Sequence, residues 1–200
     1  MRKKSHILLG WYLAERIDSK DLRLHKKAFC YGNVLPDLRP SFVTVRHEFN
    51  VNFHVICKKI RRLSEQFNFL EPYTSTYWTR MGEIVHYVAD YFTFPHNEHF
   101  EGTIVEHTLY ERELKIRLNE YILSGQAMQF TRNKKEFETA EDVIFFIKQT
   151  HDLYMRKRRS VEEDIRFIVE VCYQVVWGII QVMETVRAKK CVPEMLPEFV

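Results

Sequence analysis

Two pairs of residues in the middle of the chain have the types and spacing of metal ligands. His86 and Asp90 lie four positions apart, and so do His107 and Glu111. Residues four apart share one face of a helix, so each pair can direct an imidazole nitrogen and a carboxylate oxygen towards one point. Such mixed donors suit zinc, or another divalent ion that accepts both nitrogen and oxygen. The two pairs therefore predict a metal site between consecutive helices.

Two more residues of these types stand on turn-forming stretches. His96 follows Pro95, which ends the helical segment of the first pair and places this histidine on the connection to the second. Asp37 follows Pro36 in the same way. A carboxylate on such a connection can serve a site, although it can also be only a turn acid or a helix cap.

The remaining candidates are histidines. His6 falls in the first predicted helix, and His47 and His54 are seven positions apart and so share a helix face. Either of the latter two could supply a ligand, and His99 could compete with His96. These alternatives stay open from the residues alone, because a single histidine is often an ordinary core or surface imidazole.

The rest of the sequence is that of one helical domain. Of the 200 residues, 46% are hydrophobic, and only six are Gly and six are Pro. This apolar fraction is enough for a substantial core, and the scarcity of helix breakers favours long helices. Strand-like alternation and internal repeats are absent from the sequence. We therefore predict an all-α fold, a single-domain multi-helix bundle over residues 1–200.

Apolar residues that recur every three or four positions predict where the helices lie. Ser5 is the expected N-cap of the first helix, and Thr139 with Asp142 has the spacing of a capping box. The last helix is apolar enough to raise the question of a membrane span, but polar residues interrupt it at helical spacing. We expect a core helix and no transmembrane segment. The predicted helices cover residues 5–17, 22–29, 47–66, 75–92, 103–123, 139–154 and 161–190.

Charge and cysteine content limit the class of protein. The formal net charge of +3 is too small to indicate nucleic-acid binding, and no specific nucleic-acid motif is present. Two basic runs, at residues 58–62 and 156–159, could make a peripheral contact with an anionic membrane surface. The four cysteines form no C-x-x-C motif, which indicates thiols in a reducing compartment. Because the N-terminal segment also lacks the pattern of a secretory signal, we expect a cytoplasmic location.

The order of the candidate ligands resembles that of the bacterial zinc-dependent phospholipase C family. The resemblance extends from His6 to Glu111, and its specific parts are His86-x3-Asp90-x4-Pro95-His96 and His107-x3-Glu111. It implies an all-helical fold and a zinc centre with two ions, or three. The first ion would have four ligands, which are Asp37, His47, His86 and Asp90. The second would have three ligands, which are His96, His107 and Glu111.

The resemblance leaves the third ion open. It would be bound by His6, with Asp90 reaching towards it, and in the secreted members of the family the N-terminal amino group and its carbonyl complete the site. In this sequence five residues precede His6 and no processing signal is visible. Two zinc ions are therefore the expectation.

These ligands suit hydrolysis of a phosphodiester. A phosphodiester is an anion that resists attack, and zinc offsets its charge and lowers the pKa of a bound water to about 7. Asp37 is a candidate catalytic base as well as a ligand. With a phospholipid as substrate, the products would be diacylglycerol and a phosphorylated head group. The alternatives are a zinc nuclease or other intracellular phosphoesterase, and a non-catalytic helical protein stabilised by metal.

Overall fold

The structure is a computed structural model that describes residues 1–39, 47–68, 70–129, 133–157 and 160–191. Within these ranges it contains helices and no strand, which confirms the predicted all-α fold. The α-helices are α1 (Lys3–Arg16), α2 (Lys20–Leu24), α3 (Lys26–Gly32), α4 (Leu35–Leu38), α5 (Phe49–Ser64), α6 (Ser75–Tyr91), α7 (Ile104–Leu123), α9 (Ala140–Met155) and α10 (Val161–Cys191). Three short 3-10 helices are η2 (Glu71–Tyr73), η3 (Phe94–His96) and η4 (Gln126–Met128).

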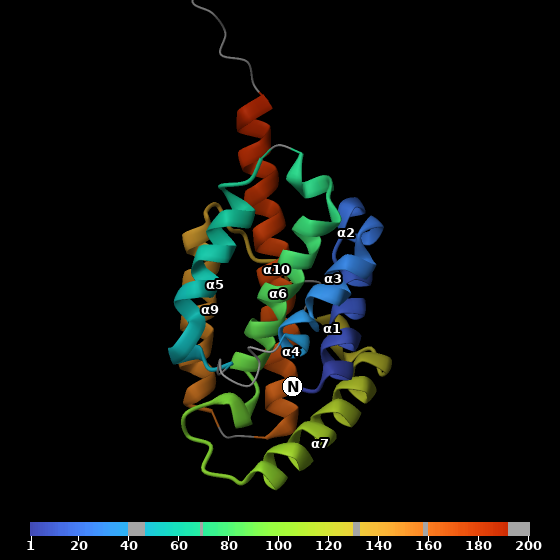
Figure 1. Cartoon of the computed structure of the whole chain (residues 1–200), viewed down its shortest axis with the longest axis vertical. Coiled ribbons are helices and arrows are strands. Elements are labelled where there is room, and N and C mark those ends of the chain that lie inside the picture. Colours follow the sequence, from blue (N-terminus) through green and yellow to red (C-terminus); the bar gives the residue numbers. More distant parts are fainter. Residues whose placement is uncertain (40–46, 69, 130–132, 158–159, 192–200) are drawn as a thin grey trace, which may run out of the picture.

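The long helix α10 lies at the centre of the bundle. It packs against α6, with α5 and α9 on one side and α1 and α7 on the other (Figure 1). By length and composition α10 could cross a membrane, but 72% of its most apolar window is buried inside the structure. A helix that is buried to this extent is a core helix. Each fully buried aliphatic side chain contributes about 1.5–3 kcal/mol to stability. Its buried apolar residues include Ile168, Val171, Val175, Ile179 and Val182.

Helices α3 and α6 touch through their backbones. A Cβ atom at Gly32 would lie 2.0 Å from the carbonyl oxygen of Thr79, and one at Gly82 would lie 2.2 Å from that of Phe29. Only glycine allows this approach. It brings the end of α3 beside the first half of α6, and His86 stands one turn after Gly82.

Helix ends agree with the sequence in part. The capping box of Thr139 and Asp142 is present at the start of α9, as predicted. The expected N-cap Ser5 was wrong, because α1 begins two residues earlier, with Arg2 at the cap position. Asp37 was expected in an irregular stretch and instead lies in α4.

Candidate metal centre

The eight predicted ligands lie in one region of the bundle. Helix α6 supplies two of them and α7 supplies two, while α1, α4, η3 and the residues just before α5 supply one each. The N-terminus of the chain lies in the same region, near α4 (Figure 1). The residues that the fold brings together are His6, Asp37, His47, His86, Asp90, His96, His107 and Glu111.

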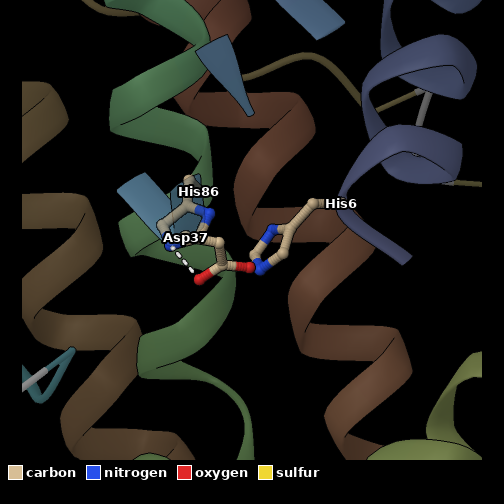
Figure 2. Close-up of side chains that lie close together, drawn as sticks. All are labelled: His6, Asp37 and His86. Carbon is tan, nitrogen blue, oxygen red and sulfur yellow. Dashed lines mark ion pairs between the residues drawn. The ribbon is translucent and has the colours of Figure 1, made fainter. Parts of the chain in front are cut away.

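Their donor atoms form three groups in which every donor lies within 4.8 Å of the others. In Figure 2 the imidazoles of His6 and His86 and the carboxylate of Asp37 converge, with His86 Nε2 3.7 Å from Asp37 Oδ1. Asp37 thus lies with His6 and His86; the resemblance had grouped it with His47, His86 and Asp90. The three groups are His6, Asp37 and His86; His47, His86 and Asp90; and His96, His107 and Glu111.

Asp90 is the carboxylate at the middle of the centre. Its side chain is 1% exposed, and its Oδ2 lies 3.0 Å from His47 Nδ1 and 3.4 Å from His86 Nε2. Its other oxygen lies 3.4 Å from His6 Nε2. Burial alone would raise the pKa of Asp90, but the Met1 ammonium and the surrounding imidazoles hold it well below its usual value. Asp90 is therefore a carboxylate that can be shared between ions.

His86 is oriented by a backbone contact. Its Nδ1 lies 2.9 Å from the carbonyl oxygen of Asn33, which can only accept, so Nδ1 carries the proton and donates. The lone pair is then on Nε2, which faces Asp90. Burial, together with the neighbouring His6, lowers the pKa of His86 well below its usual value. A neutral imidazole held by an outer hydrogen bond is the form in which histidine binds metal.

His6 supports the fit of the centre to a metal ion. The side chain is fully buried and stacks on His86, with ring centroids 4.0 Å apart. Within the described part of the chain neither of its ring nitrogens makes a hydrogen bond, although Nε2 lies 3.4 Å from Asp90 Oδ1. A buried polar group without a partner is costly and rare, and a bound cation would satisfy it. The donor set of imidazoles and carboxylates is also the one that zinc accepts.

The third group is more open than the other two. Both His96 Nε2 and His107 Nε2 lie 3.3 Å from Glu111 Oε1, and the exposed side-chain fractions of the three residues are 13%, 33% and 16%. Hydrogen bonds from the two histidines outweigh the effect of burial and lower the pKa of Glu111. A cavity of about 500 Å³ opens onto these residues. The group can therefore bind a metal and still admit a ligand from solvent.

The amino group of Met1 is a member of the centre, although the five residues before His6 had led us to expect no N-terminal amine there. Its nitrogen lies 2.5 Å from Asp90 Oδ1, 3.2 Å from Glu111 Oε1 and 3.1 Å from His96 Nε2. Burial works against the charged amine, but the attraction of Asp90 and Glu111 gives it a raised pKa. The five residues before His6 thus bring the amine to the ligands, because α1 starts at once and turns Met1 inwards.

Two further residues position a ligand without binding it. The carboxylate of Asp164, in α10, accepts a hydrogen bond of 2.7 Å from the backbone N–H of Phe94. Asn97 donates to the carbonyl oxygen of Thr93 over 2.9 Å. Together these bonds hold η3 and its ligand His96. Neither role could be predicted from the sequence. Asp164, for example, has the position of an ordinary acid in the first turn of a helix.

The structure shows where the alternative histidines lie relative to the three groups. His47 is buried among the ligands, whereas His54 is exposed on α5. His99 is 53% exposed and lies 3.6 Å from Glu98, away from the three groups.

His151 predicts an acid-sensitive contribution to stability beside the centre. It stacks on Phe49 and contacts Asn97 Oδ1 through Nε2, and burial lowers its pKa to about 4. In the unfolded chain its pKa is about 6.5. As the pH falls through 6.5 the unfolded state takes up the proton first, so stability is lost between about pH 6.5 and pH 4.

We expect this group to cost about 2 kcal/mol of unfolding free energy between pH 7 and pH 5. Urea unfolding of the zinc-free protein and of His151→Gln at both pH values measures it. The variant should lose about that much less stability than the wild type. Parallel losses in the two proteins would show that His151 titrates normally.

A family of known proteins matches most of the chain. The sequence model of the family described as zinc-dependent phospholipase C matches residues 5–161, a range that contains all eight predicted ligands. No curated protein and no solved structure matches the chain. With most of its length matched and its donor groups suited to zinc, the chain belongs to the zinc-dependent phospholipase C family.

Proposed function

We propose that the protein is a phosphodiester hydrolase of phospholipase C type that uses two zinc ions, with a third held near His6. Membership of the family supports a zinc-dependent hydrolase and a lipid substrate. The observation that carries the proposal is the half-open group of His96, His107 and Glu111 at the inner end of a cavity. Structural zinc sites are closed, whereas catalytic ones keep a position for water or substrate.

The side chains of the centre would bind two zinc ions in separate groups. His96, His107 and Glu111 would hold an ion at the cavity, and His47, His86 and Asp90 would hold one behind it. Zinc bound there would offset the negative charge of a phosphodiester and lower the pKa of a water molecule to about 7. The outer bond from His86 to Asn33 would keep its imidazole in the binding orientation.

Asp37 is our candidate for the catalytic base. Its carboxylate lines the cavity beside His107 and Glu111, and burial raises its pKa above the usual value for aspartate. A raised pKa makes a carboxylate a better proton acceptor near neutral pH. From this position Asp37 would take the proton from the attacking water. The water oxygen would bond to phosphorus and the bond from phosphorus to the diacylglycerol oxygen would break. That oxygen would take up the proton that Asp37 had accepted, which releases diacylglycerol and the phosphorylated head group.

We expect Asp37→Asn to reduce kcat on the order of 10²-fold, with a smaller change in KM. The assay is hydrolysis of bis(p-nitrophenyl) phosphate and of phosphatidylcholine vesicles by zinc-loaded protein. Asp21→Asn, on α2 and outside the centre, is the matched control and should keep its rate.

A short oligonucleotide as third substrate separates the alternatives. Faster turnover of the oligonucleotide than of the lipid would favour a zinc nuclease. Fully zinc-loaded wild-type protein that hydrolyses none of the three substrates would contradict catalysis and favour a metal-stabilised helical protein.

A further inference from the structure

Four cations stand around the cavity that opens on the metal centre. Besides the centre's own residues, the cavity is lined by Arg2, Lys3, Lys4 and Lys115. Lys3 and Lys4 are exposed, and Arg2 and Lys115 are half-buried. Within the described part of the chain none of the four forms an ion pair, whereas Lys59 is paired with an acid. Their charge is therefore available to a ligand.

The cations come from two helices that line the cavity. Arg2, Lys3 and Lys4 belong to the start of α1, and Lys115 stands on α7 one turn after the ligand Glu111. A ligand that reaches the metal centre through this cavity comes close to them. We call Arg2, Lys3, Lys4 and Lys115 the cationic rim.

The cationic rim works against the stability of α1. The N-terminal end of a helix carries a partial positive charge and favours acidic residues. Helices α9 and α10 follow this rule, since each has acidic residues in its first turn. The first turn of α1 has none and carries Lys3 and Lys4 instead. Basic residues at this end of a helix are favourable when an anion from outside the helix binds to them.

We propose that the cationic rim binds a second anionic group of the substrate, beyond the phosphodiester that is hydrolysed. The inference rests on the proposed phosphodiesterase function. The metal centre accounts for one phosphate. Lys3 and Lys4 are exposed whereas His96 and Glu111 are half-buried, so the rim lies on the solvent side of the centre, where the head group extends. The preferred head group then carries a phosphate or carboxylate of its own, and a choline head group, which is cationic, is disfavoured.

Short-chain lipids used as dissolved monomers test this preference. One probe is dihexanoyl phosphatidylinositol 4-phosphate, whose head group carries a second phosphate. The other is dihexanoyl phosphatidylglycerol, whose only phosphate is the phosphodiester. In water, the attraction between one pair of unit charges in contact strengthens binding by about fivefold. Several partly screened cations together should therefore strengthen it by about tenfold. We expect kcat/KM of the wild type to favour the first lipid by about that factor.

The variant Lys3→Gln/Lys4→Gln/Lys115→Gln removes three charges of the rim and no proposed ligand. We expect its preference to fall to about twofold or less. The matched control is Lys20→Gln/Lys27→Gln/Lys148→Gln, which removes three exposed cations elsewhere and should keep the wild-type preference. An equal preference in the rim variant and the wild type would overturn the proposal.

A binding measurement keeps the test independent of turnover. Titration calorimetry of zinc-loaded protein compares 3-phosphoglycerate with glycerol 3-phosphate, which lacks the carboxylate. Wild type should bind 3-phosphoglycerate about tenfold more tightly, and the rim variant should bind both alike. If wild type binds the two ligands in this ratio but hydrolyses no lipid, the proposed function is wrong, whereas binding of an anionic group by the rim is supported. Equal affinities in wild type would overturn the rim whether or not the enzyme is active.

Vesicles distinguish the head group from the membrane surface. If the rim binds the substrate's own head group, adding anionic lipid to vesicles should not change which lipid is hydrolysed faster. If the rim variant loses only activity on anionic vesicles, and keeps its preference among monomers, the cations contact the bilayer and the proposal is wrong.

Discussion

Zinc-reconstituted protein with Asp90→Asn is expected to hydrolyse phosphodiesters on the order of 10³-fold more slowly than wild type and to lose bound zinc. Asp90 is nearly fully buried and lies within 3.4 Å of nitrogens of His6, His47 and His86. The amide that replaces it has almost the same shape but no charge. It therefore tests the electrostatic role of the carboxylate rather than its volume.

The same substitution should destabilise the zinc-free protein. In that state Asp90 is the nearest counter-charge of the buried Met1 ammonium. Removing one partner of a buried ion pair costs about 3–5 kcal/mol. Urea unfolding measures this loss of stability. Elemental analysis measures the loss of zinc, and a phosphodiesterase assay measures the loss of activity. Asp18→Asn, whose side chain is 81% exposed, is the control and should behave as wild type. Full zinc content and near-normal activity in Asp90→Asn would contradict a shared carboxylate at the middle of the centre.

The second large effect is expected from Asp164→Ala, which should lower the unfolding free energy by about 3–5 kcal/mol. Asp164 is fully buried and accepts three hydrogen bonds. They come from the backbone N–H of Phe94 over 2.7 Å and from the hydroxyls of Tyr110 and Tyr154 over 2.8 Å each. Burial and the charge of Asp164 both raise the pKa of Tyr110, so its hydroxyl stays a donor. Alanine removes the carboxylate that accepts these three hydrogen bonds, of which the one from Tyr154 is buried and the other two are half-buried.

A loss of zinc should accompany this loss of stability, because η3 carries His96 and is tied to α10 through Asp164. Urea unfolding and zinc content are the two readouts. Glu162→Ala removes an exposed acid from the same turn of α10 and should change stability by less than about 0.5 kcal/mol. If Asp164→Ala proved as stable as that control, the network would have no structural role.

The sequence predicted those parts of the site that depend on local spacing. His86 with Asp90, and His107 with Glu111, could be paired because residues four apart share a helix face wherever the helix lies. The capping box of Thr139 could be found for the same reason, since its bonds span three residues.

What the sequence could not predict depends on contacts between distant segments. Met1 meets Asp90 across 89 positions, and Asp164 meets Phe94 across 70. Nothing in the local pattern marks either contact. His47 and His54 share a helical spacing, yet only the packing of the chain buries the first among the ligands and leaves the second in solvent.

The most direct test of the account is the zinc content of the purified, reconstituted protein. Elemental analysis should find about two or three equivalents per chain in wild type, and about one fewer in each of His86→Ala and His107→Ala. No donor group contains both residues, since His86 is a member of two groups and His107 of the third, so the two variants report on different groups. Less than one equivalent in wild type after reconstitution, with the same thermal stability in all three proteins, would contradict a polynuclear zinc centre.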